Sequence, residues 1–319
     1  MRDDAIAPVI AAMLILAALV TFFSIWNAVY VPSMKESSEV GHLENVESAF
    51  QHFSSDIDYA ASSYQNNLIF SEPVQLGGGD VMVNLLKSSG TLQVQNETDP
   101  IYTLILTDGA GNTVALVNSS IVDFSYQPVN NFWQNQGYRW QYGYINVTKY
   151  GELSTPLGYY NMTDVENEIS TPGSLQTFAQ SFGMVSATPN MTPQGYGNLS
   201  DLDLWVVSMY ANPAHSFVSG NGFGSLRLTS AINTTSYTNI AEISIGSNDA
   251  LFGSGVMDNW YSGFSRISTT YSPYPANIIV DNSQGVDNYL YYNGSTINQP
   301  TDMPVTVNLH QVNIEISAN

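Results

Sequence analysis

The longest apolar run of the chain lies at its N-terminus. No charged side chain occurs between Ala5 and Met34, and the run opens with AIAPVIAAMLILAALVTFF. At about 1.5 Å per residue, a helix over 5–31 spans roughly 40 Å, more than the ~30 Å hydrocarbon core of a bilayer. The run exceeds the apolar core of a signal peptide, and no small-residue cleavage site follows it. The pattern therefore predicts a transmembrane helix that stays on the protein.

A second helical pattern follows Pro32, whose missing N–H should disturb the helix. Over 33–66, apolar residues recur at spacings of three and four, as on one face of an amphipathic helix: Val40, Leu43, Val46, Phe50, Phe53, Ile57 and Tyr64. Glutamates and aspartates occupy the other face, which places this half outside the bilayer. The stripe either seats the helix on the following domain or contacts neighbouring copies, and we favour the first interpretation.

From residue 67 to 319 the pattern changes to short β segments separated by Gly, Pro and Asn. Tyr102 to Thr107 and Thr113 to Val117 flank a turn-forming DGAGN segment, which predicts a hairpin. Residues 132–146 predict an aromatic strand pair. Near the C-terminus the apolar alternation shifts by one residue, which predicts a β-bulge near His310 and Gln311.

The absence of long helical patterns after residue 67 decides the fold class. Only 164–182 suggests a short helix, interrupted at Pro172. Parallel sheets need helical crossovers, so an antiparallel arrangement is favoured. We predict an α+β protein, a long N-terminal helix followed by a large antiparallel β-sandwich-type head that folds by itself. Residues 186–198 are the best linker candidate if the head divides in two.

The N-terminal residues also carry a family resemblance. The charged leader MRDD (1–4), followed by Ala5, Ile6, Ala7, Pro8 and Val9 and a long apolar run, resembles the N-terminus of archaeal type IV pilin-like proteins. The resemblance implies cleavage between Asp4 and Ala5 by a prepilin peptidase, then packing of the helix into a filament core by assembly machinery. Bacterial type IV pilins carry glutamate at the fifth mature position, where Val9 stands here, so the docking chemistry of that glutamate does not carry over.

Small residues in the apolar run would let helices approach closely in such a bundle. We therefore expect the anchor and bundle surface to comprise Ala5, Pro8, Val9, Ala11, Ala12, Leu16, Ala17, Ala18 and Phe22.

Composition excludes several function classes. A net charge of −20, from 7 Lys+Arg against 27 Asp+Glu, argues against nucleic acid as a partner, because such binding rests on clustered cations. Zero cysteines exclude disulfides, thiolate metal sites and thiol nucleophiles. Stability must therefore come from the hydrophobic core.

Sequons for N-glycosylation all lie beyond the apolar run, on the expected outer side. The candidates are Asn96, Asn118, Asn146, Asn161, Asn198, Asn233 and Asn293, with Asn190 the weakest because Pro193 follows its threonine. We expect some of them to be used.

Candidate chemical sites are sparse. Asp281, Ser283 and Asp287 place oxygen side chains at alternate positions, as a loop around Ca²⁺ would, although an Asx-rich turn explains them as well. No cofactor is otherwise expected. No nucleophile elbow or paired histidines occur, so we expect no enzyme activity. Several aromatics could form a sugar platform or simply fill the core: Trp133, Trp140, Trp205, Tyr291 and Tyr292.

Two functions remain open. The first is a structural subunit of an archaeal type IV pilus-like extracellular filament, a homopolymer joined by its N-terminal helices after a membrane-anchored stage. The alternative is a non-polymerising, membrane-anchored surface adhesin or minor pilin whose head binds a cell, a surface or a glycan. Both place the protein at the cell surface.

Overall fold

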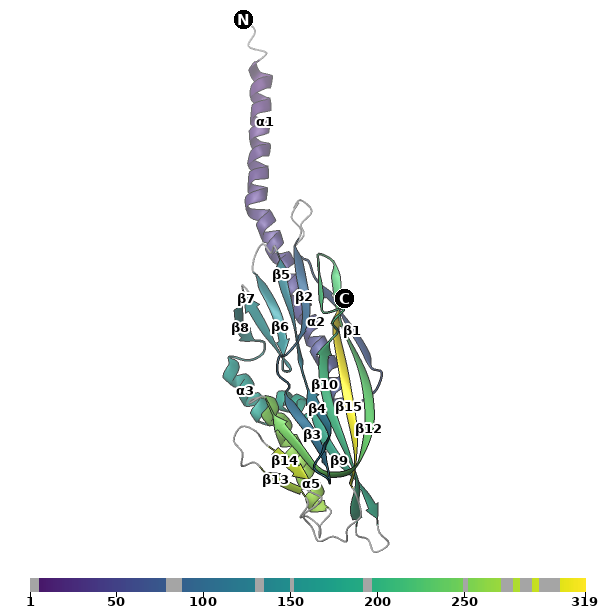
Figure 1. The fold of residues 1–319 in the computed structure, drawn as a ribbon. Helices are drawn as coiled ribbons and strands as arrows, with labels where there is room; N and C mark the ends of the chain where they lie inside the picture. The colour runs from purple at the N-terminus through teal and green to yellow at the C-terminus, as the bar shows by residue number, and fades with distance from the viewer. Residues whose placement is uncertain are drawn as a thin grey trace.

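A computed structural model describes residues 6–78, 88–129, 135–149, 152–191, 197–248, 252–270, 278–281, 289–292 and 305–319. An unbroken helical rod leads into a β-rich head, and its first part stands clear of that head (Figure 1). The rod consists of α1 (Ile6–Ile25), a π-helical turn η2 (Trp26–Tyr30) and α2 (Val31–Ser63). The rod ends at Tyr64, which adopts the left-handed conformation with φ of 49°, a few residues before the predicted end.

The predicted disturbance near Pro32 takes the form of the π-helical turn. Pro32 has no N–H for the carbonyl of Ala28, and its ring would crowd that carbonyl in a regular α-helix. In the structure the N–H of Val31 bonds instead to the carbonyl of Trp26, five residues back. The helix therefore continues through the proline without a break.

The described strands form two large sheets and one strand pair. The seven-stranded sheet has the order β4-β3-β12-β15-β10-β9, with β1 also paired to β12. Its strands are β1 (Ile69–Gln75), β3 (Tyr102–Asp108), β4 (Thr113–Ser119), β9 (Gly183–Met191), β10 (Gly197–Ala211), β12 (Phe223–Ser247) and β15 (Val305–Ala318). The predicted hairpin is confirmed as the antiparallel pair β3 and β4.

The six-stranded sheet has the order β11-β2-β5-β6-β7-β8. Its strands are β2 (Ser89–Asn96), β5 (Val122–Val129), β6 (Gln136–Gln141), β7 (Tyr144–Lys149), β8 (Glu152–Pro156) and β11 (Phe217–Gly220). β6 and β7 are the predicted aromatic strand pair. Tyr142 and Gly143 join them with φ of 51° and 87°, the two positive values that a tight two-residue hairpin turn needs. The separate pair is β13 (Ile278–Asp281) and β14 (Tyr289–Tyr292).

Three helices belong to the head. α3 (Met162–Ser170) and α4 (Ser174–Gln180) confirm the predicted interrupted helix, but α5 (Phe252–Thr270) contradicts the expectation of no long helix after residue 67. Its glycines hid the helical spacing of Val256, Trp260 and Phe264, which are buried. A Cβ at Gly263 would lie 2.5 Å from the Val185 side chain, so the glycine lets α5 lie close against β9.

The predicted bulge near His310 and Gln311 is wrong. β15 keeps an unbroken register with β10 and β12 through both residues. The apolar phase shifts because the buried face changes along the strand. Leu309 lies beside Leu204, which lies beside Val185, the residue that Gly263 of α5 approaches, so Leu309 is on the sheet face toward α5. Ile314 and Ile316 lie on the opposite face, and β15 contacts α2 and β2. β15 is covered on one face near its start and on the other face near its end. This change of buried face explains the shift in apolar alternation without a β-bulge.

The structure adds detail to two expectations about the head. The sheet is mostly antiparallel, but β10 and β15 are parallel neighbours, connected by a long segment that includes β12 and α5. Residues 186–198 were the linker candidate, yet their described parts are paired strands: Gly197 of β10 lies opposite Met191 of β9. These described parts therefore belong to neighbouring strands of one sheet.

The core of the head includes α2. Five large apolar side chains of α2 are buried among the strands: Leu43, Val46, Phe50, Phe53 and Ile57. This confirms the interpretation that the stripe seats the helix on the head, although Val40 remains 42% exposed. The structural head therefore begins within α2, and 67–319 lacks part of its own core.

Candidate functional site

The outstanding surface of the molecule is α1. Val9, Leu16 and Phe22 are 56%, 63% and 58% exposed, and none of the described side chains of α1 is buried. An all-round apolar helix is stable only inside a bilayer or packed against other apolar surfaces. Within the part of the chain that the structure describes, one helix is long and apolar enough to cross a membrane, and α1 supplies its apolar length.

An aromatic ladder marks the outer end of this apolar surface. The rings of Phe22 and Trp26 stack with centroids 6.2 Å apart, and those of Trp26 and Tyr30 stack at 5.3 Å. Aromatic side chains with a polar edge concentrate at membrane–water interfaces. The first charges after Asp4 are Lys35 and Glu36, which lie a few residues beyond this ladder. The sequence thus places apolar, aromatic and charged residues in the order of hydrocarbon, interface and water.

The predicted bundle residues divide into bulky and small positions on α1. Ala11 and Ala18 lie seven residues apart and therefore share one helix face, where a neighbouring helix could approach closely. The hydroxyl of Thr21 donates to the Ala17 carbonyl at 2.8 Å, so α1 presents no unpaired hydroxyl there. Pro8 fits in the first turn because no intrahelical bond is lost there. Asp4 and Ala5 lie outside the described residues.

Polar contacts add to the apolar stripe in holding α2 against the head. The hydroxyl of Tyr138 donates to Glu47 at 3.1 Å, and the indole N–H of Trp140 donates to Ser54 at 2.8 Å. Burial raises the pKa of Tyr138 to about 12, so this hydroxyl remains a neutral donor. The helix and the six-stranded sheet therefore move as one body.

His42 extends this attachment to the turn after β1. Its Nε2 lies 2.8 Å from the Tyr126 hydroxyl, which itself donates to the Leu76 carbonyl at 3.0 Å. Because the Tyr126 hydroxyl donates its hydrogen to Leu76, it can only accept from His42. The Nε2 atom of His42 therefore carries the imidazole hydrogen. Desolvation by burial lowers the pKa of His42, against smaller opposing effects of Gln75 and Glu39. The histidine is a neutral structural group at physiological pH.

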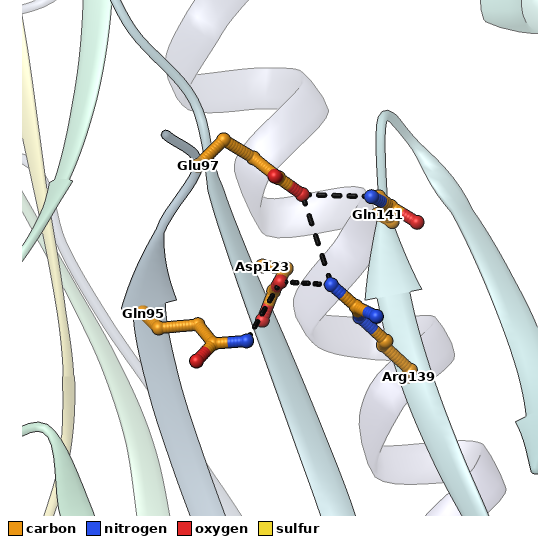
Figure 2. A network of polar contacts seen from close by, with 5 residues as sticks. All are labelled: Gln95, Glu97, Asp123, Arg139 and Gln141. Carbon is orange, nitrogen blue, oxygen red and sulfur yellow. Dashed lines mark hydrogen bonds and ion pairs between the residues drawn. The ribbon is translucent and has the colours of Figure 1, made fainter. Parts of the chain in front are cut away.

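A polar network lies across β2, β5 and β6, as Figure 2 shows. Arg139 pairs with the buried carboxylate of Asp123 and lies 3.9 Å from Glu97. Gln95 donates to Asp123 at 3.0 Å and Gln141 donates to Glu97 at 2.7 Å. The guanidinium of Arg139 pairs with Asp123 of β5 and approaches Glu97, which follows β2. Arg139 and Gln95 both bond to Oδ2 of Asp123, whereas its buried Oδ1 has no hydrogen-bond partner among the described residues. The network joins neighbouring strands and fixes their register.

A second polar row crosses the seven-stranded sheet. The Thr234 hydroxyl lies 2.8 Å from His310 Nδ1, and His310 Nε2 lies 3.2 Å from Asp203. This order of hydroxyl, imidazole and carboxylate is also found in nucleophilic sites. Here Trp205 stacks on the imidazole at 4.1 Å and Asn308 donates to the same oxygen of Asp203. We assign the row to cross-strand pairing. Sequence reasoning missed it because the three strands meet only in the fold.

The structure separates the predicted sequons by exposure. Asn96, Asn118, Asn161 and Asn233 are exposed, whereas Asn146 is only 3% exposed and lies opposite Arg139. Asn161 caps α3 by accepting from the Asp164 N–H. Asn190 and Asn198 lie in β9 and β10, and Asn293 lies outside the described residues.

The structure describes only some of the remaining candidates. Asp281 ends β13, but Ser283 and Asp287 lie outside the described residues, and the described part of the chain holds no group of three or more His, Asp or Glu side chains suited to a metal ion. Trp140 is fully buried and Trp205 lies on the other sheet, so these two do not form a shared sugar platform. Trp133 lies outside the described residues, and Tyr291 and Tyr292 lie on β14.

No protein-family model, curated protein or solved structure matches this chain.

Proposed function

We propose that this protein is a structural subunit of an archaeal type IV pilus-like extracellular filament that polymerises through its N-terminal helix. The observation that carries the proposal is the exposed, charge-free α1, continuous with a helix rooted in the core of the head. A bilayer covers this surface in the precursor. Once the helix leaves the lipid, other copies of α1 must cover it.

Magnitudes support a partner for α1. Eleven large apolar side chains of α1 are about half exposed or more: Val9, Ile10, Met13, Leu14, Ile15, Leu16, Leu19, Val20, Phe22, Phe23 and Ile25. Burying a fully exposed side chain of this size stabilises by about 1.5–3 kcal/mol, so covering eleven half-exposed ones contributes roughly 8–17 kcal/mol. That is comparable to the roughly 5–15 kcal/mol that stabilises a whole domain. The helix has no stable exposed state in water.

Replacing Leu16 with Asp tests the proposal, with Leu16→Met as the matched control. A carboxylate at the centre of an apolar bundle costs several kcal/mol, roughly 3 kcal/mol even in the membrane. We expect the aspartate variant to abolish surface filaments and the methionine variant to retain them, as imaged by electron microscopy of intact cells. Filaments of normal number from the aspartate variant would contradict the proposal.

The absence of cysteine offers a second test. Copies that carry Ala11→Cys should form disulfide-linked dimers on cells, whereas Tyr160→Cys, on an exposed head residue, should remain monomeric. The alternative, a tethered adhesin or minor pilin, predicts monomers for both variants. The mass of the N-terminal peptide of the native protein tests processing. A mature chain that begins at Ala5 would support the prepilin pathway, whereas one that begins at Met1 would support a permanent membrane tether.

A further inference from the structure

Strand edges of the two large sheets differ in how they are protected from pairing with other chains. An unpaired edge offers free N–H and C=O groups, and natural proteins guard it with prolines, charges or very short strands. β1 carries Glu72 and Pro73, β9 carries Pro189, β8 ends at Pro156, and β11 has only 4 residues. Each of these edges has a recognised guard.

Two described edges have none of these guards. The first is β4, whose sequence TVALVNS contains no charge and no proline, and whose Leu116 is 60% exposed. Ile101 N–H bonds to the Ser119 carbonyl, so by alternation the backbone groups of Leu116 and Asn118 point away from β3. This edge joins an exposed apolar side chain to backbone groups that pair with no described strand.

The second unguarded edge lies in the middle of β12. On one side β12 pairs with β1 up to Thr229 and with β3 from Ile240, and the Asn66 side chain accepts from the Ile232 N–H. Among the described strands, Asn233 to Tyr237 (NTTSY) pair only with β15, which lies on their other side. Ser230 bonds toward the β1 side, so by alternation the backbone groups of Thr234 and Ser236 also point to that side, where no described strand pairs with them.

Each unguarded edge carries an exposed sequon, Asn118-Ser119-Ser120 on β4 and Asn233-Thr234-Thr235 on β12. The Asn118 Oδ1 accepts from Thr103 at 2.9 Å, which leaves its Nδ2 available. We propose that Asn118 and Asn233 carry N-linked glycans that shield these two edges against strand pairing between heads. The proposal rests on the proposed function only in placing the head outside the membrane.

The modification is a transfer from a lipid-phosphate-linked oligosaccharide. The amide Nδ2 forms a bond to the anomeric carbon of the first sugar and loses one proton, while the bond from that carbon to the phosphate oxygen breaks and the lipid phosphate leaves. No oxidant or reductant is needed. A branched, hydrated sugar at the edge then excludes a second strand sterically.

Peptide mass spectrometry of the full-length protein from its native surface tests occupancy. We expect glycan mass on the peptides with Asn118 and Asn233 and unmodified asparagine at the buried Asn146. Thr235→Ala should remove the mass at Asn233 while the asparagine remains. Unmodified asparagine at both 118 and 233 would overturn the glycan proposal, even if filaments form. Glycans at these positions without filaments would overturn only the proposed function.

The shielding role has its own test, sedimentation of detergent-solubilised protein that carries Leu16→Asp, so that helix bundling does not contribute. Asn118→Gln combined with Asn233→Gln should raise the sedimentable fraction several-fold. Adding Leu116→Lys, a charge on the β4 edge, should reverse most of that rise. Equal sedimentation with and without the glycans, or no rescue by the lysine, would refute shielding.

Discussion

His42 is the residue at which the helix, β5 and the turn after β1 meet. Its neutral imidazole is required because the ring is buried and its Nε2 hydrogen is directed to Tyr126. Burial lowers the pKa of His42 below the ordinary 6.5. Between 6.5 and the lowered value, the unfolded chain binds a proton that the folded chain does not. Folding stability contributed by this residue is therefore complete above pH 6.5 and declines as the pH falls below it.

Replacing His42 with Gln should flatten this pH dependence, because glutamine retains an N–H donor for Tyr126 and does not titrate. We expect the free energy of unfolding of the natural protein, minus that of the variant, to fall as the pH is lowered from 7.5 to 5.5. Urea unfolding in detergent at several pH values measures this difference, in which titrations common to both proteins cancel. Parallel curves would show that His42 is not the group responsible.

At the scale of elements, the π-helical turn sets how the head is rotated relative to α1. The turn exists because Pro32 cannot supply an N–H and crowds the preceding carbonyl. Pro32→Ala restores the missing donor, so Trp26–Tyr30 should return to α-helical bonding and rotate the head about the helix axis. Pro8→Ala is the matched control, because a proline in the first turn removes no intrahelical bond.

Electron-spin distance measurements in nanodiscs can detect this rotation. Spin labels at Leu16→Cys and Tyr160→Cys are site-specific because the chain has no cysteine of its own. We expect Pro32→Ala to shift the distance distribution and Pro8→Ala to leave it unchanged. An unchanged distribution in Pro32→Ala would mean that the π-helical turn is imposed by something other than the proline.

For the whole molecule, the helical rod supplies both the exposed apolar α1 and, through α2, part of the core of the head. These two roles determine where the chain can be shortened. Removing α2 takes Leu43, Val46, Phe50, Phe53 and Ile57 from the core, a loss of about 10 kcal/mol. That is comparable to the entire stability of a typical domain. A chain that begins at Lys35 should therefore fold as a soluble monomer, whereas one that begins at Asn67 should aggregate. Circular dichroism and size-exclusion chromatography distinguish the two, and a folded monomer from 67–319 would show that α2 is dispensable.

Patterns in the sequence predict the elements that depend on residues close to one another along the chain. The uncharged run, the apolar spacing of α2, the β3–β4 hairpin and the break between α3 and α4 all follow from side chains within a few residues of one another. The exposed apolar surface of α1 is of the same kind, because none of its described side chains is buried and each keeps the character of its own sequence. These features were predictable because hydrophobic period and turn chemistry act over short distances.

Contacts between distant segments decided the rest. The phase shift in β15 reflects two different covering elements on its two faces, which one strand's pattern cannot distinguish from a bulge. The glycine-rich α5 is stabilised by close packing on β9, which overrides its weak helix propensity. Asn118, Asn233 and the buried Asn146 each begin a sequon of their own. Only strand order and burial distinguish the two exposed asparagines from Asn146. Burial and edge position belong to the assembled sheets, so the sequence alone could name these residues but not rank them.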